Sequence, residues 1–386
     1  MTMIDISKRH FLKTGLLALG SGLLAGCNNG QKRTGLLPAD DNSVRLLPGL
    51  KSRVVARSSK PVLPDSRYHW HPAPDGGACF PAADGGWIYV SSSETSPNGG
   101  AGAIVFNASG EIMDAYSILS GTRRNCAGGA TPWGSWLSCE EVPDGCVWEC
   151  DPQGRRPAVP RPALGVFMHE AVAVDTNSQQ LYLTEDRTDG CLYRFTPDSM
   201  TAGGFADLRS GALEVAVMHD EKAGVLRWHA LSDAGAGNTE TRYQVDEALR
   251  FNGGEGIVFA PSAHGGDIVF TSKGDNRVWS YAPESSRLNI LYDAATSPTP
   301  FLTGVDNITA AADGDFYVAE DGGDMQIVVI PAQGAMYPLL QLEGHEASEI
   351  TGVAFSPDGS RLYFSSQRGT AGSSDKGITY EVSGNF

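Results

Sequence analysis

The chain has 386 residues, a formal net charge of −16 and 47 glycines, and 41% of its residues are hydrophobic. So negative a chain is not expected to bind nucleic acid, because phosphate binding requires clustered lysine and arginine, whereas it is compatible with divalent cations. The abundant glycine and the short runs of aromatic and β-branched residues favour many short strands joined by tight turns.

The first residues resemble an export signal. A basic stretch at residues 8–13 precedes an uncharged apolar run at 16–25 that is too short to span a bilayer, so residues 1–26 are predicted to be a signal peptide. The stretch around Lys8-Arg9 resembles a twin-arginine signal with lysine in the first position. The run LAGC at residues 24–27 matches a lipobox, which predicts a lipid-modified Cys27. The alternative is an ordinary secretory peptide in which Gly26-Cys27 is coincidental.

These signals predict an organisation in three parts. Residues 1–26 are the signal peptide, residues 27–40 a lipid-anchored flexible tether, and residues 41–386 one folded domain of about 345 residues. The expected location is the cell envelope, with the protein facing the periplasm or at the outer membrane and contacting the membrane only through its lipid.

The domain contains a degenerate repeat. In four copies a polar residue opens a strand, a turn follows, and a second strand ends in a polar cluster. The pairs are 170–175 with 181–186, 255–261 with 268–275, 306–310 with 316–321, and 349–359 with 362–367. Third strands follow at 191–195, 277–281, 327–330 and 378–382. Such units, repeated at roughly 40–50 residues, are typical of propeller blades. We therefore predict an all-β fold, a β-propeller of six blades.

The residues that open these copies predict a central metal-binding channel. Glu170, Glu255, Asp306 or Asn307, and Glu349 occupy equivalent places. The first strand of each blade runs beside the propeller axis, so these side chains would point at one volume and repel one another unless a cation lay among them. The alternative is ordinary turn chemistry, but glutamate is not a favoured turn residue and it opens three of the four copies.

Six cysteines follow Cys27, at positions 79, 126, 139, 146, 150 and 191. An even number in an oxidising compartment is compatible with disulfides, yet the cluster at 126–150 is equally able to supply one metal ligand. The sequence leaves both readings open.

Several blocks resemble the PhoX family of bacterial alkaline phosphatases. The most specific are NCAGGATPWGSWLSCEE at 125–141, followed by FMHEA at 167–171, YLTEDR at 182–187 and YRF at 193–195. Weaker matches are GGEG at 253–256, TSKGDNRVW at 271–279, EITG at 349–352 and SPDG at 356–359. The likeness runs from about residue 125 to residue 367.

The resemblance implies an exported, monomeric propeller that hydrolyses phosphomonoesters with calcium ions and a pair of iron ions in its channel. One cysteine thiolate would bridge the irons; Cys126 is the first choice and Cys139 the competing one. The resemblance implies that the metal ligands besides Cys126 are Glu140, Glu141, Glu170, Glu185, Glu255, Asp275, Asp321 and Glu349. The repeat adds Asp306 to this set. The chain departs from the family in being shorter than the large phosphatases, so loops that carry part of their activity are expected to be trimmed.

Arg187 and Lys273 are the candidates for holding phosphate oxygens as catalytic residues, although each is also plausible as an ordinary ion-pair partner. No serine or threonine stands out as a covalent nucleophile. Two alternative functions follow from the same features. One is a calcium-dependent, lactonase-like hydrolase, and the other is a lipid-anchored, calcium-stabilised propeller that binds a partner without catalysis.

Overall fold

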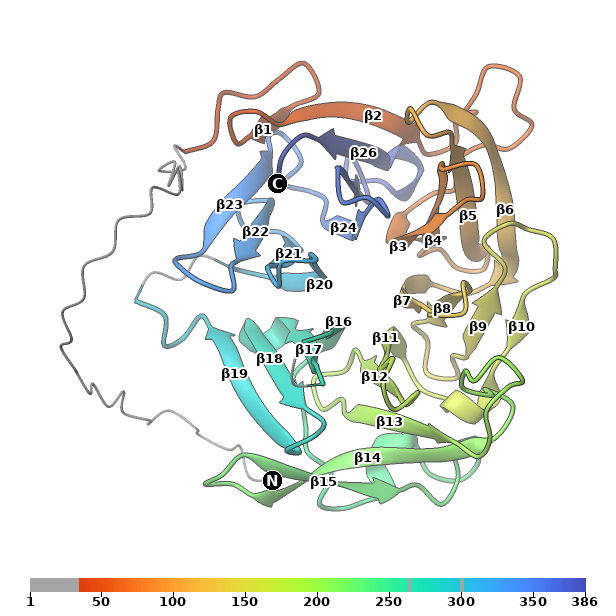
Figure 1. Ribbon diagram of the computed structural model, residues 1–386, viewed down its shortest axis with the longest axis vertical. Coiled ribbons are helices and arrows are strands. Elements are labelled where there is room, and N and C mark those ends of the chain that lie inside the picture. The colour runs from red at the N-terminus through yellow and green to blue at the C-terminus, as the bar shows by residue number, and fades with distance from the viewer. Residues whose placement is uncertain (1–34, 263–264, 299–301) are drawn as a thin grey trace, which may run out of the picture.

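The computed structural model describes residues 35–262, 265–298 and 302–386, and its strands surround a common centre (Figure 1). The described residues contain four short 3-10 helices and no α-helix; the helices are η1 (Pro162–Leu164), η2 (Thr241–Tyr243), η3 (Lys273–Asp275) and η4 (Ser374–Lys376). Among the described residues, none belongs to a helix long and apolar enough to cross a membrane. The predicted all-β propeller fold is confirmed. The predicted signal peptide and Cys27 lie outside the described residues.

Five hydrogen-bonded sheets build the molecule. Two of them follow chain order. The first contains β3 (Pro74–Pro81), β4 (Trp87–Ser93), β5 (Gly99–Phe106) and β6 (Ile112–Thr122). The second contains β7 (Asn125–Ala130), β8 (Trp136–Glu140), β9 (Val147–Cys150) and β10 (Val159–Pro160).

The third sheet has nine strands and consists of two runs. One run is β11 (His169–Val174), β12 (Leu181–Glu185), β13 (Leu192–Pro197), β14 (Gly211–Asp220) and β15 (Val225–Ala230). The other is β16 (Gly254–Ala260), β17 (Asp267–Ser272), β18 (Arg277–Ala282) and β19 (Arg287–Asp293). The runs join where Val225 pairs with Arg287, so the sheet can be counted as one unit or two. The expected count of six blades therefore stays a prediction.

The last two sheets each recruit a strand from the N-terminal end of the domain. One contains β20 (Val305–Ala310), β21 (Phe316–Glu320), β22 (Gln326–Ile330) and β23 (Tyr337–Leu342), with β1 (Val44–Leu46) at its outer edge. The other contains β24 (Ile350–Phe355), β25 (Arg361–Ser366) and β26 (Ile378–Ser383), with β2 (Lys51–Arg57) outermost. This pairing fastens the two ends of the domain together. The domain contacts begin before β1, because the N–H of Leu37 donates to the carbonyl of Leu46 at 2.9 Å.

Hydrophobic cores lie between neighbouring sheets. Tyr317 and Ile327 of one sheet share a core with Phe364 and Tyr380 of the next. The strands of a sheet that is covered on both faces have continuous apolar sequences instead of alternating apolar and polar residues. This is why the second strands of the repeat, such as β12 with all its residues buried, were recognisable in the sequence.

Six strands, β3, β7, β11, β16, β20 and β24, lie nearest the centre, and each contacts the next around a closed ring (Figure 1). Each carries a register shift near its start, in the first sheet between Pro74 and Gly77. Such a bulge adds one residue to the strand and redirects its side chains. Glycine permits the close approach of these strands, since a Cβ on Gly76 would lie 2.4 Å from the Cα of Ala127.

Candidate metal centre

The bulge places one residue of each central strand in an equivalent position, directly after the first paired residue. These residues are Asp75, Cys126, Glu170, Glu255, Asp306 and Thr351. The sequence had placed Glu349 here, and the pairing of Ile350 with Ser366 corrects that by two residues. Glu349 still reaches the same centre, because its carboxylate lies close to those of Asp306 and Asp321.

A second set of residues directly follows the second strand of each unit. Its members are Glu94, Glu141, Asp186, Lys273, Asp321 and Gln367. In three units the residue just before, at the end of the strand, is also a glutamate, namely Glu140, Glu185 and Glu320. These three carboxylates accept backbone N–H groups of nearby turns, so they support the loops instead of facing the centre.

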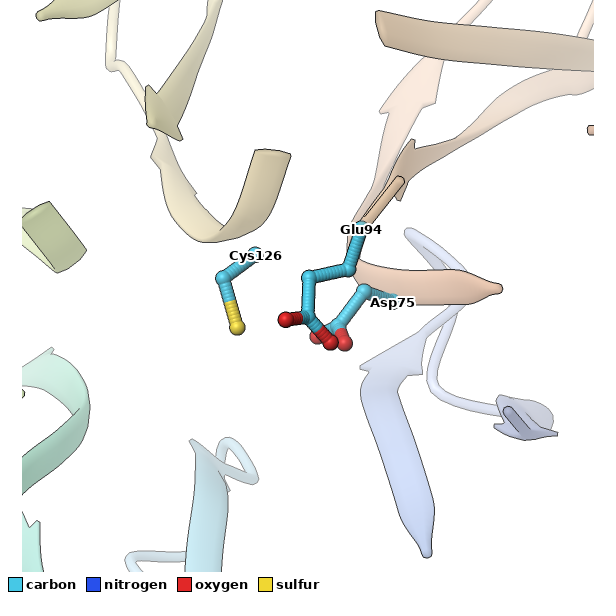
Figure 2. Close-up of side chains that lie close together, drawn as sticks. All are labelled: Asp75, Glu94 and Cys126. Carbon is cyan, nitrogen blue, oxygen red and sulfur yellow. The ribbon is translucent and has the colours of Figure 1, made fainter. Parts of the chain in front are cut away.

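Four overlapping groups of acidic side chains result. In each group, one potential ligand atom per residue lies within 4.8 Å of the others: Asp75 with Glu94 and Cys126; Cys126 with Glu141 and Glu170; Glu170 with Glu255 and Asp306; and Asp306 with Asp321 and Glu349. Figure 2 shows the Cys126 thiol beside the carboxylates of the first group. Each group shares one residue with the next in this order, so the nine side chains form one continuous series around the centre, which we call the acidic ring.

The ring is crowded with like charges in buried surroundings. Burial and the neighbouring Glu255 and Glu141 raise the pKa of Glu170 well above its ordinary value. Glu170 is 1% exposed, and its Oε1 has no hydrogen-bond partner among the described residues. Burial together with adjacent acidic groups also raises the pKa of Glu141 to about 9 and that of Asp306 to about 7.

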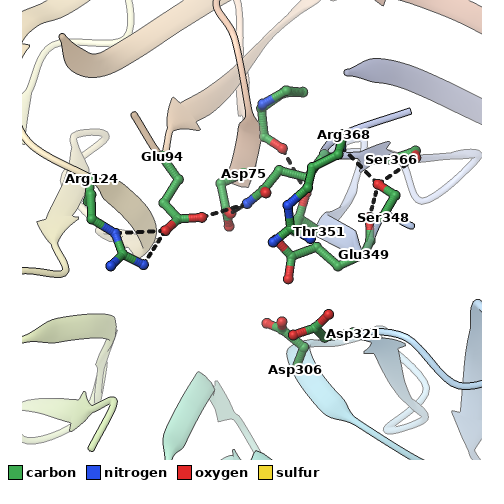
Figure 3. A network of polar contacts seen from close by, with 12 residues as sticks. Asp75, Glu94, Arg124, Asp306, Asp321, Ser348, Glu349, Thr351, Ser366 and Arg368 are labelled. Carbon is green, nitrogen blue, oxygen red and sulfur yellow. Dashed lines mark hydrogen bonds and ion pairs between the residues drawn. The ribbon is translucent and has the colours of Figure 1, made fainter. Parts of the chain in front are cut away.

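Three cationic side chains contact the ring. Arg124 pairs with Glu94 at 2.5 Å (Figure 3) and with Glu141 at 2.6 Å, and Arg368 pairs with Glu349 at 2.8 Å. The third is the ammonium group of Lys273. Eight carboxylates and one thiol thus face three cations, which leaves an excess of negative charge that metal ions would neutralise.

Most of the predicted ligands meet in this ring. Cys126, Glu141, Glu170, Glu255, Asp306, Asp321 and Glu349 belong to it. Two members were missed, Asp75 and Glu94, because the first sheet lay outside the recognised repeat. The available signals were an acidic residue before Gly76-Gly77 and another after the strand that ends in Ser93.

Three predicted ligands, Glu140, Glu185 and Asp275, lie outside the ring in this structure. Glu140 accepts the N–H groups of Arg123 and Cys146 and the indole of Trp148, at 2.9, 3.2 and 3.1 Å. It ends β8 inside the ladder, so its side chain turns away from the ring that its neighbour joins.

Glu185 and Asp275 are also committed to local contacts. Glu185 accepts hydrogen bonds from Tyr193 at 2.8 Å and from Arg242 at 3.0 Å. Asp275 belongs to η3 and binds the hydroxyl of Ser272 at 2.5 Å and Arg277 at 3.0 Å. Both carboxylates stabilise turns at the ends of strands.

The comparisons with known proteins agree with this centre. The family described as alkaline phosphatase PhoX matches residues 90–369. The chain belongs to the PhoX family. The matched segment contains every member of the acidic ring except Asp75. No curated protein matches the chain.

Several solved structures resemble the chain at low sequence identity. A Bacteroides thetaiotaomicron protein of unknown function is 9% identical with a TM-score of 0.50, over 86% of this chain and 76% of its own. A gluconolactonase from Xanthomonas campestris is 10% identical (TM-score 0.48, 92% and 99% covered), and a putative 6-phosphogluconolactonase from Bacteroides uniformis is 14% identical (TM-score 0.42, 78% and 79%). At these identities the likenesses carry no argument about activity.

In this PhoX chain, the six cysteines of the described residues are free thiols. Cys139, the competing choice of thiolate, is fully buried in a hydrophobic core with Leu137 and Val147 and belongs to none of the four acidic groups. Cys126 is the cysteine that joins the acidic groups. Burial raises the pKa of the Cys126 thiol, and the nearby carboxylates of Asp75 and Glu170 raise it further. A bound metal would therefore be needed to favour the thiolate.

His169 is fully buried, its Nε2 contacts the carbonyl of Gly165 at 3.0 Å, and it belongs to none of the acidic groups. The two predicted phosphate ligands differ in their surroundings. Lys273 lies in the ring, in contact with its carboxylates. Arg187 lies one residue after Asp186, and its Nε is buried without a hydrogen-bond partner among the described residues.

Proposed function

We propose that this PhoX protein hydrolyses phosphomonoesters at the acidic ring, with calcium and iron as its metal ions. The observation that carries the proposal is the continuity of the ring, in which Cys126 and eight carboxylates form four overlapping groups. Its support is that these residues lie almost wholly within the segment that the PhoX family matches.

The donor set suits this pair of metals. Calcium prefers carboxylate oxygens, whereas a thiolate favours a transition metal such as iron. Iron would therefore be held by the groups that contain Cys126, with Glu141 and Glu170 beside it, and calcium by carboxylates alone. The unpartnered Oε1 of Glu170 supports a cation at this point, because a buried carboxylate oxygen without a partner is costly.

When bound, such cations neutralise the charge of the transferring phosphoryl group and favour the ionised form of an attacking water. The chain itself holds the cations and orients the substrate. Arg124 and Arg368, whose side chains are 42% and 34% exposed, provide guanidinium groups at the rim of the ring. We keep Arg187 as a further phosphate ligand, because its Nε has no hydrogen-bond partner among the described residues.

We also propose that the protein acts as a monomer at the cell envelope, facing the periplasm or at the outer membrane. The support for this location is the basic stretch, the apolar run and the LAGC sequence at residues 24–27. Soluble phosphomonoesters of that compartment are the expected substrates.

The test compares phosphatase and lactonase activity in one preparation. Purified protein is assayed with a chromogenic phosphomonoester and with a lactone, before and after chelation of calcium and iron. We expect phosphatase activity that chelation abolishes and that both metals together restore. Asp75→Asn should reduce the turnover at least tenfold, since it removes a ring carboxylate.

Asp358→Asn is the matched control, because Asp358 binds Ser356 and Ser360 in the turn after β24 and is outside the ring. Its activity should equal that of the unchanged protein. Hydrolysis of the lactone alone would replace the proposal with the lactonase alternative. Metal binding without either activity would favour the non-catalytic binding protein.

A further inference from the structure

Lys273 differs in charge from the other residues at its position in the repeat. It directly follows β17, at the place that Glu94, Glu141, Asp186 and Asp321 occupy in other units and Gln367 in the last. Among these six equivalent residues it is the one cation. The sequence thus introduces a positive charge where four units introduce a carboxylate.

The ammonium group reaches carboxylates from three strand ends. Its Nζ lies 2.9 Å from Glu255, 3.2 Å from Asp321 and 4.0 Å from Asp306. The backbone holds the residue in this place, because the N–H of Lys273 donates to the carbonyl of Gly253 at 2.8 Å. Although burial disfavours its charged form, Asp306, Glu255 and Asp321 raise the pKa of Lys273 above its ordinary value.

These contacts fall on one side of the ring. Two of the four groups consist of carboxylates alone, and they share Asp306. Lys273 contacts Glu255 and Asp306 of one and Asp306 and Asp321 of the other. None of these residues belongs to the groups with Cys126. A divalent cation placed among the same three carboxylates would lie against an ammonium group and be repelled.

We propose that the Lys273 ammonium is a built-in cation that takes the place of a calcium ion among Glu255, Asp306 and Asp321. The inference rests on the proposed function and narrows it, because calcium in the unchanged protein is then held by ring carboxylates that Lys273 does not contact, such as Glu170 and Glu349. It also changes the role expected from the sequence, because an ammonium group committed to three carboxylates is not a phosphate ligand. Removing the charge while keeping the length of the side chain should create an additional calcium site.

The experiment measures calcium content. Lys273→Met and Lys273→Gln are prepared as full-length protein, equilibrated with calcium, and analysed for calcium per chain by elemental analysis and calorimetry. We expect one more calcium ion per chain in both variants than in the unchanged protein. Lys273→Arg keeps the charge and should keep the original calcium content. Lys376→Met controls for net charge, because Lys376 pairs with Asp375 on the surface.

Thermal unfolding supplies a second measurement. In chelator, both neutral variants should have a lower melting temperature than the unchanged protein, because three carboxylates lose their cation. Adding calcium should raise the melting temperature of these variants more than it raises the melting temperature of the unchanged protein. Equal calcium content in all variants would overturn the inference. A KM for phosphomonoester raised tenfold or more at unchanged calcium content would instead make Lys273 a phosphate ligand. If the unchanged protein binds calcium but hydrolyses no phosphomonoester, the proposed function fails, and a gain of calcium in the variants still upholds the inference.

Discussion

Glu170→Gln offers the most direct test of the acidic ring, because it should act with opposite sign in the presence and absence of metal. Glu170 belongs to two of the four groups and is 1% exposed. The substitution keeps the size of the side chain and removes its charge. Without metal it relieves repulsion in the ring; with metal it removes a ligand.

The expected magnitudes follow from the geometry. Two like charges 4.8 Å apart repel by about 3 kcal/mol at an effective dielectric constant of about 20. Because part of this repulsion is already relieved by protonation, removing the charge of Glu170 should raise the free energy of unfolding of the metal-free protein by about 1–3 kcal/mol. A hundredfold loss of affinity for the ions of both groups lowers metal-linked stability by about 5 kcal/mol, which exceeds that gain. At about 1–2 °C per kcal/mol for a domain of this size, the midpoint should rise by about 1–6 °C in chelator and fall by about 2–8 °C with metals bound.

The assay is calorimetry of both proteins in chelator and in saturating calcium and iron. Glu140→Gln is the matched control, because Glu140 is also buried, in the neighbouring sheet, but accepts the N–H groups of Arg123 and Cys146. Its loss of stability should be the same with and without metal. A Glu170→Gln midpoint that shifts in the same direction under both conditions would refute the view that this carboxylate is a metal ligand.

Three further predictions concern iron, pH and the anchor. Cys126→Ser should remove bound iron, any thiolate-to-iron absorption band and phosphatase activity while far-ultraviolet circular dichroism stays unchanged; iron retained at the original level would exclude a Cys126 ligand. In the chelated protein, the pKa values of Asp306 (about 7) and Glu141 (about 9) are raised above the value near 4 of an unfolded carboxyl group, so the folded state binds more protons than the unfolded state. The contribution of these groups to stability should therefore be largest below about pH 4 and be lost as the pH rises towards 9. The urea midpoint should be lower at pH 9 than at pH 5, and a higher midpoint at pH 9 would contradict the prediction. Cys27→Ser should move the protein from the membrane fraction to the soluble fraction, and unchanged membrane association would count against lipidation.

Much of the fold was predictable because the repeat is carried by local patterns. Strands such as β12 and β17 are buried on both faces and are bounded by turns, so they stand out as short apolar runs. Glu170 and Glu255 were recognised as ring members because each opens a strand in a clear copy. Cys126 was recognised because the resemblance to PhoX is most specific around it.

The remaining members of the ring depended on details of register. Adjacent residues of a strand face opposite sides, so a shift of one residue decides whether a carboxylate binds metal or supports a turn. Glu140 and Glu141 are chemically alike in the sequence, yet the first ends β8 and binds backbone N–H groups while the second faces the ring. Local sequence contains no signal that separates them.

Residue type and spacing alone predict that strands alternate with turns, that acidic residues open several of the strands, and that one cysteine joins these residues. Which carboxylates meet depends on how the sheets pack around the centre. Asp75 and Glu349 lie 274 positions apart and enter one ring because the first and last central strands, β3 and β24, are neighbours around the axis. The same packing also decides the place of Lys273, whose charge is visible in the sequence but whose three carboxylate partners come from different strands. Such contacts depend on the closure of the ring of strands, and no local pattern specifies them.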